Sequence, residues 1–167
     1  MIRIRNGQPE EIHLLQRIEQ QAAERFASIG MRQLEITGAA VLEERARQGR
    51  LLVAEVDAVA AGFVIFSEVD DSAYIEELDV HPDFAGQRLG ARLIDQVEAW
   101  ANREGLAALT LSTFRYVPWN APYYARLGFT VITGEIGPRL AAIAREHAAK
   151  AFDIAPRVFM RRLLGDG

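Results

Sequence analysis

Two adjacent carboxylates, Glu76 and Glu77, stand near the end of an apolar stretch and are followed by a glycine-bearing segment. In a strand over residues 73–80, successive side chains alternate between the two faces of the sheet, so one of these carboxylates faces a cleft. A carboxylate in a cleft can take a proton from a substrate. Its ordinary pKa makes it a weak base, so either burial raises that pKa or water relays the proton. A solvated acidic edge is the competing interpretation.

The glycine-bearing segment over residues 81–91 has the order turn, loop and helix start. Backbone N–H groups at a helix start have no intrahelical partner, and the helix dipole favours an anion there. Gly86 and Gly90 let the backbone approach a phosphate closely. A Walker loop requires Gly-Lys-Ser/Thr, which is missing here, and the three spaced glycines of the dinucleotide fingerprint are missing too. The segment therefore predicts either a phosphate site of another kind or an ordinary turn before a helix.

Two motifs together resemble those of the GNAT superfamily of N-acetyltransferases. The strand ending Leu78-Asp79-Val80, followed by the loop that ends at Gly90, is similar to motif A of that family. Residues 124–129, Tyr-Ala-Arg-Leu-Gly-Phe, match the Tyr-x-x-x-Gly-Phe of motif B, about 35 residues further on. The resemblance covers nearly the whole chain in its order of strands and helices, but only these two motifs are specific.

The resemblance implies acetyl-CoA as cosubstrate, an amine as acceptor, and transfer by direct attack on the thioester without a metal. It places Tyr124 as the general acid that protonates the leaving thiolate, and a phenol with a pKa of about 10 is protonated at neutral pH. It places the base on the Glu76 face of the strand, with Glu77 as the second candidate. Asn120 is either a coenzyme contact or only a helix cap. The implied coenzyme contacts are the pantetheine set Leu78, Asp79 and Val80 and the pyrophosphate set Gly86, Gln87, Arg88, Leu89, Gly90 and Ala91.

Arg88 departs from the family pattern, because it stands where motif A has its first glycine. A side chain there crowds the phosphate or resists a positive φ angle, whereas its charge offsets part of the loss. This departure favours one rival function, a non-catalytic module that binds coenzyme A as a sensor or partner protein. The intact Tyr124 motif favours catalysis. A nucleotide-phosphate enzyme is a weaker rival.

The elements that must position these residues form one α/β (α+β) domain over residues 1–167. Alternation and turn residues predict antiparallel hairpins first and strand–helix–strand units later. The resemblance to the GNAT family implies a mixed, mostly antiparallel central sheet flanked by helices, in which two central strands splay apart at the coenzyme. The expected strands cover residues 2–5, 50–56, 60–69, 73–80, 106–113, 129–133 and 157–164. Five helices are expected. The first begins near residue 8, the second covers residues 39–48, and the third runs from about residue 89 to 103. The fourth is a short helix that starts near residue 118, and the fifth covers residues 138–150.

Composition narrows the function classes further. The chain has 167 residues, no cysteine and a formal net charge of −4. Absence of cysteine excludes disulfides, thiolate metal sites and a cysteine nucleophile. The acidic balance argues against a nucleic-acid partner and suits a cationic amine. No pair among the three histidines has metal-ligand spacing, and no apolar run resembles a signal peptide or a membrane span. A cytoplasmic protein without a membrane partner is expected, with a homodimer left open.

Overall fold

The computed structural model describes residues 1–31, 34–149 and 156–165. Strands and helices alternate much as the sequence predicts, and short 3₁₀ turns occur at Pro9–Glu11, Glu24–Ile29 and Pro82–Phe84. The strands are β1 (Ile2–Asn6), β2 (Leu51–Val56), β3 (Val59–Val69), β4 (Ser72–Val80), β5 (Ala108–Phe114), β6 (Thr130–Val131) and β7 (Arg157–Leu163). The helices are α1 (Ile12–Ala23), α2 (Ala39–Arg47), α3 (Leu89–Arg103), α4 (Ala121–Arg126) and α5 (Pro138–Ala149).

The strands form one mixed sheet in the order β1-β2-β3-β4-β5-β7-β6. Pairing is antiparallel between β1 and β2, β2 and β3, β5 and β7, and β6 and β7, and it is parallel between β4 and β5. The prediction of a mixed, mostly antiparallel sheet flanked by helices is confirmed. The parallel pairs run from Ser72↔Ala108 to Ile75↔Leu111, and β4 continues for five residues beyond them to Val80.

The described chain divides into two compact units. The first contains residues 1–66 and 76–96, and the second contains residues 67–75 and 97–167. The single domain over residues 1–167 therefore stays a prediction. No described helix combines the length and the apolar character that crossing a bilayer requires.

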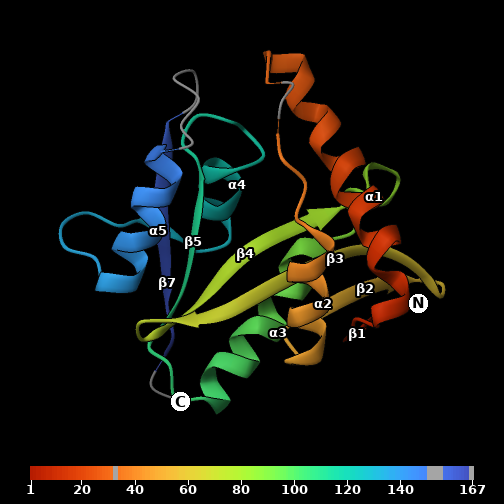
Figure 1. The fold of residues 1–167 in the computed structure, drawn as a ribbon, viewed down its shortest axis with the longest axis horizontal. Coiled ribbons are helices and arrows are strands. Elements are labelled where there is room, and N and C mark those ends of the chain that lie inside the picture. The colour runs from red at the N-terminus through yellow and green to blue at the C-terminus, as the bar shows by residue number, and fades with distance from the viewer. Residues whose placement is uncertain (32–33, 150–155, 166–167) are drawn as a thin grey trace. The chain divides into compact units, whose positions relative to one another are not determined.

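The core of the first unit lies between α1, α2 and the strands β2 and β3 (Figure 1). Ile12, Leu15 and Ile18 recur at helical spacing along α1, and each is at most 2% exposed. They pack with Leu42 of α2 and with four strand side chains, Leu51, Val53, Phe63 and Ile65. Burial of each large aliphatic side chain stabilises the fold by roughly 1.5–3 kcal/mol, so this face fixes α1 on the sheet.

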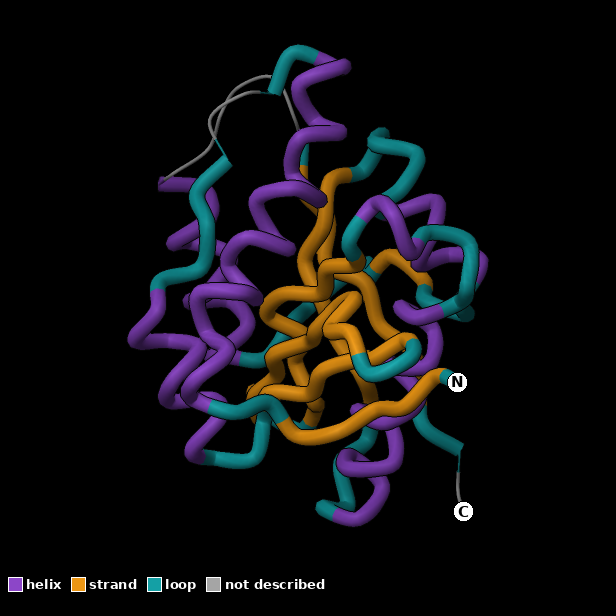
Figure 2. The backbone as a smooth tube through the Cα atoms, turned by 90° about the vertical axis from the view of Figure 1, so that its right-hand side faces the viewer, coloured by secondary structure: helices purple, strands orange, loops and turns teal. Residues whose placement is uncertain are grey.

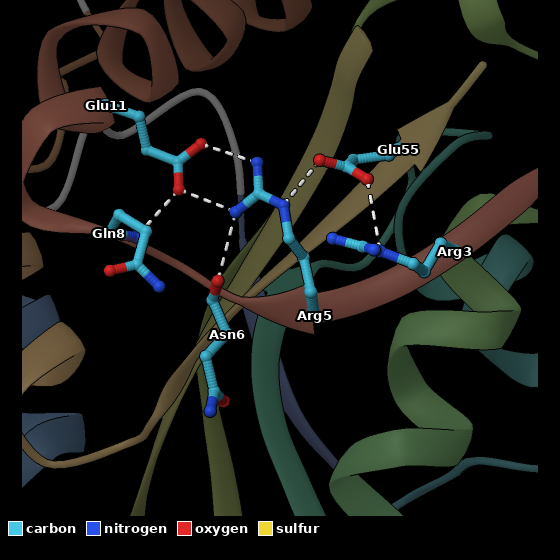
Figure 3. Close-up of polar contacts among 6 residues, drawn as sticks. All are labelled: Arg3, Arg5, Asn6, Gln8, Glu11 and Glu55. Carbon is cyan, nitrogen blue, oxygen red and sulfur yellow. Dashed lines mark hydrogen bonds and ion pairs between the residues drawn. The ribbon is translucent and has the colours of Figure 1, made fainter. Parts of the chain in front are cut away.

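An ion-pair network ties β1 to its neighbours in the same unit (Figure 3). Arg5 donates to Glu11 through both terminal guanidinium nitrogens, at 2.7 and 2.9 Å, and through Nε to Glu55 at 2.5 Å. The hydrogen bond with Glu11 is the main reason that the pKa of Arg5 is raised, against a lowering by burial. Arg5 thus joins the turn before α1 to strand β2. Figure 2 marks the N-terminus at the extended strand that leads into this turn.

The second unit has its own small core, in which Val69, Tyr74 and Leu140 are buried. Asp70, at the turn between β3 and β4, accepts hydrogen bonds from the backbone N–H groups of Arg139 and Leu140, both at 3.1 Å. These amides belong to the first turn of α5, where no intrahelical partner exists, so Asp70 caps that helix. Lys150, the expected end of this helix, lies outside the described residues.

Candidate functional site

The turn before α3 has the backbone geometry of an anion site. Gly86 and Arg88 adopt positive φ angles of 83° and 61°, and both residues are exposed. The N–H of Arg92 donates to the carbonyl of Arg88 at 3.1 Å. Because this is the first turn of α3, the amides of Leu89, Gly90 and Ala91 precede the first intrahelical bond. Their partial positive charges can bind an anion at this end of the helix.

Arg88 is held in a conformation that glycine adopts without strain. A left-handed conformation costs a residue with a Cβ roughly 1–2 kcal/mol. Arg88 nevertheless adopts the positive φ angle that its side chain was expected to resist, and the loop retains the strain of that conformation. The loop therefore combines a positive φ angle at Arg88 with an exposed guanidinium.

The side chain of His81 has a structural role in the preceding turn. The Nδ1 of His81 accepts a hydrogen bond from the backbone N–H of Asp83 at 3.0 Å. The backbone N–H of His81 donates to the carbonyl of Ala61 at 2.7 Å, which joins the end of β4 to β3. Gly62 lies at this junction, where a Cβ would stand 2.7 Å from the carbonyl oxygen of Asp79. The close approach of β3 to residues 78–80 therefore requires glycine.

Of the two adjacent carboxylates, Glu76 is engaged in an ion pair. Arg45 of α2 donates through Nε and a terminal nitrogen to the two carboxylate oxygens of Glu76, at 2.5 and 2.8 Å. The hydrogen bond that Arg45 donates to Glu76 is the main cause that raises the pKa of Arg45. Both carboxylate oxygens of Glu76 are therefore engaged by a single guanidinium.

Glu77 belongs to a different arrangement, a cluster of three carboxylates. Glu19 of α1 and Glu77 and Asp79 of β4 each bring an oxygen to within 4.8 Å of the others. Glu77 and Asp79 share one face of the strand, as alternation predicts. We call Glu19, Glu77 and Asp79 the carboxylate cluster.

Burial and mutual repulsion shift the acidity of this cluster. Burial, followed by the charge of Glu77, raises the pKa of Glu19 to about 7. Burial likewise raises the pKa of Asp79 to about 7, with the charge of Glu19 acting in the same direction and a hydrogen bond with Glu77 acting against it. A carboxyl group with a pKa near neutral is a much better proton acceptor than an exposed one.

Glu19 is the site residue that sequence reasoning missed. Its side chain is 4% exposed, and Oε1 accepts hydrogen bonds from the N–H and the hydroxyl of Thr37, both at 2.9 Å. The signal was present, because Glu19 follows Leu15 by four residues and Ile12 by seven, on the apolar face of α1. An acidic residue on such a face requires a partner or a function.

In the second unit, Tyr124 lies on the short helix α4 among aromatic rings. Its ring packs edge-to-face with Phe129 at 5.8 Å and with Tyr123 at 5.3 Å between centroids. Gly128, with a φ of 90°, ends this segment, and the N–H of Phe129 returns to the carbonyl of Tyr124 at 3.1 Å. The Tyr-x-x-x-Gly-Phe pattern therefore fixes the tyrosine ring, which is half-buried.

Asn120 occupies the N-cap position of α4, but its side chain makes no capping hydrogen bond. Its Nδ2 donates to the carbonyl of Trp119 at 3.0 Å instead. Asn120 therefore stands at the capping position expected as one alternative, but its side chain does not cap the helix. The coenzyme contact stays a prediction.

The same fold occurs in solved structures, two of which are described as N-acetyltransferases. Ard1 from Thermoplasma volcanium aligns with a TM-score of 0.73 and 19% identity, over 99% of each chain. The ribosomal-protein-S18-alanine N-acetyltransferase from Escherichia coli aligns with a TM-score of 0.67 and 19% identity, over 100% of this chain and 98% of that one. The PaiA N-acetyltransferase from Thermoplasma acidophilum, solved in complex with coenzyme A, gives 0.66 and 16%, over 98% and 99%. These alignments show that the chain shares the fold of these proteins.

The sequence identifies the family directly. The model of the acetyltransferase (GNAT) family matches residues 13–129, which include the loop before α3 and the Tyr124 motif. The chain belongs to the GNAT family of acetyltransferases. The predicted resemblance is confirmed, and family membership supports acetyl transfer with acetyl-CoA as the donor.

Proposed function

We propose that the protein transfers the acetyl group of acetyl-CoA to a primary amine by direct attack of the amine on the thioester. The observation that carries this proposal is the turn before α3 in a chain of the GNAT family. Two positive φ angles and the first-turn amides of a long helix suit the pyrophosphate of the coenzyme. In this proposal residues 86–91 bind the pyrophosphate, and the guanidinium of Arg88 adds a charge-assisted contact.

The end of β4 is proposed to bind the pantetheine arm. Leu78, Asp79 and Val80 lie beyond the parallel pairs of β4 with β5, and backbone groups at the end of a strand can hydrogen-bond a ligand. A backbone N–H there can also donate to the thioester oxygen as negative charge develops on it during attack. Gly62 supports this arrangement from the other side, since it allows β3 to approach Asp79 closely.

The proton of the attacking amine is proposed to pass to the carboxylate cluster, with Glu77 as the group on the reacting side. An alkylamine with a pKa of about 10.4 is almost wholly protonated at pH 7, so a proton acceptor is needed before attack. The cluster supplies groups with a pKa near 7, whereas Glu76 is bound by Arg45. Glu76 remains the second candidate.

Tyr124 is proposed to return a proton to the sulfur as the thiolate leaves. The support is the intact motif and the fixed ring between Tyr123 and Phe129. Proton transfer from the phenol to the thiolate gives the free thiol of coenzyme A and leaves a phenolate. The second proton, which the nitrogen loses after attack, returns to the phenolate through solvent. Asn120, next to this helix, is proposed as a further coenzyme contact.

Thiol release from acetyl-CoA in the presence of a panel of primary amines tests the proposal. The expected result is amine-dependent release of one thiol for each acetylated amine. Binding of coenzyme A without any turnover would instead support the non-catalytic sensor or partner module. Calorimetry with coenzyme A and with ATP separates both functions from a nucleotide-phosphate enzyme, because only coenzyme A is expected to bind.

A further inference from the structure

The carboxylate cluster leaves two buried oxygens without hydrogen-bond partners among the described residues. These are Oε2 of Glu19 and Oδ2 of Asp79, and neither atom is reached by solvent. Thr37 fixes Glu19 through its other oxygen, so the free oxygen is oriented by the fold. Leaving a buried charged acceptor unpaired costs more than leaving a neutral one, and such groups in proteins ordinarily find a donor. The cluster is therefore built for a group that donates hydrogen bonds.

The geometry of the cluster suits one tetrahedral nitrogen. A primary ammonium group has three N–H donors and no acceptor. Three oxygens that each lie about 2.8 Å from one tetrahedral nitrogen are about 4.6 Å apart, at charge-assisted hydrogen-bond length. The three carboxylates of the cluster offer oxygens within 4.8 Å of one another, one for each donor. A planar guanidinium, by contrast, pairs best with both oxygens of a single carboxylate, as Arg45 does with Glu76.

We propose that Glu19, Glu77 and Asp79 bind the ammonium group of the acceptor, and that this acceptor has no carboxylate beside its amine. The inference rests on the proposed function and specifies its substrate class. A carboxylate one carbon away from the amine would stand against three acidic groups and be repelled. Arg45 offers it no compensation, because Glu76 already holds that guanidinium through two hydrogen bonds. Alkylamines, amino-acid amides and peptide N-termini fit, whereas free amino acids are disfavoured.

The test compares alaninamide with alanine as acceptors for the wild-type protein, Glu19→Gln and Glu43→Gln. Glu43 is an exposed residue of α2, and its variant makes the same charge change outside the cluster. The quantity measured is the ratio of kcat/KM for alaninamide to kcat/KM for alanine, in which the different amine pKa values cancel between variants. Removing one of the three carboxylates is expected to lower this ratio about tenfold. Glu43→Gln is expected to leave it unchanged.

Binding of propylammonium, followed by ligand-observed NMR, provides a readout without turnover. Wild type and Glu43→Gln are expected to bind it, and Glu19→Gln to bind it about tenfold more weakly. Asp79→Asn repeats the measurement if Glu19→Gln does not fold, as judged by circular dichroism. Propylammonium binding that depends on Glu19, without thiol release from any acceptor, would support the ammonium site and overturn the proposed function. Thiol release with an unchanged acceptor ratio and unchanged binding would overturn the ammonium site alone.

Discussion

Glu19→Gln should change the stability of the protein in a pH-dependent way. The pKa of the Glu19 carboxyl rises from 4.5 to about 7, mainly because the group is buried. Between these values the native state binds more protons than the unfolded state, so the free energy of unfolding falls as pH rises through this window. A shift of this size corresponds to about 3 kcal/mol at most, fully lost above pH 7.

Glutamine removes this loss, because it is neutral at every pH and keeps a side-chain oxygen for the two donors of Thr37. Urea unfolding at several pH values should therefore show nearly equal stability for wild type and Glu19→Gln below pH 4.5. Above pH 7 the variant should be more stable by up to about 3 kcal/mol. The charge of Glu19 also helps to raise the pKa of Asp79, so the variant should lower that pKa as well.

Glu43→Gln is the control for this measurement, because it makes the same charge change at an exposed position outside the carboxylate cluster. The reasoning fails if the stability curves of Glu19→Gln and wild type stay parallel from pH 4.5 to pH 8. A Glu19→Gln protein less stable than wild type above pH 7 would also refute it, because it would mean that the buried carboxylate is paired.

Three further variants test the loop, the strand junction and the acid. Arg88→Gly should raise the free energy of unfolding by about 0.5–1 kcal/mol, because the backbone strain is lost and the greater entropy of the unfolded chain offsets only part of that gain. Arg88→Ala keeps the Cβ and should not raise the free energy of unfolding. Denaturant midpoints compare the two variants, and equal midpoints would mean that no strain is stored. Both variants should weaken coenzyme A binding about tenfold in calorimetry if the guanidinium contacts phosphate, and full affinity would remove Arg88 from the site. Gly62→Ala should destabilise the protein by about 1–3 kcal/mol, because its Cβ meets the carbonyl of Asp79, and a neutral result would contradict the close approach of the strands. Tyr124→Phe should lower kcat about 100-fold and leave the KM for acetyl-CoA unchanged, and an undiminished kcat would exclude Tyr124 as the acid.

The sequence predicts the elements of this fold well because their patterns are local. Apolar periodicity in α1, the turn Asp57-Ala58 and the apolar run of β5 each depend on neighbours within a few residues. The largest differences are at short pieces, such as the 3₁₀ turn Glu24–Ile29 and the two-residue strand β6. Such pieces have few hydrogen bonds of their own and are decided by what packs on them.

Only those parts of the candidate site that a local sequence pattern defines could be predicted from the sequence. The loop before α3 and the Tyr124 segment were visible because glycines and a spacing define them. The role of Glu76 was not, because its ion pair with Arg45 joins residues 31 positions apart. The same holds for the carboxylate cluster, which brings α1 to the end of β4. Alternation predicts which face Glu77 and Asp79 share, but not which helix covers that face.

The central claim is that amides at the start of α3 bind the coenzyme's pyrophosphate. Backbone ¹⁵N–¹H NMR of the labelled protein, titrated separately with coenzyme A and with pantetheine, tests it directly. Coenzyme A should shift the amide signals of residues 86–91 strongly, and pantetheine, which lacks the diphosphate, should leave those signals in place while moving residues 78–80. Coenzyme A binding that leaves the amides of residues 86–91 unshifted would contradict the claim.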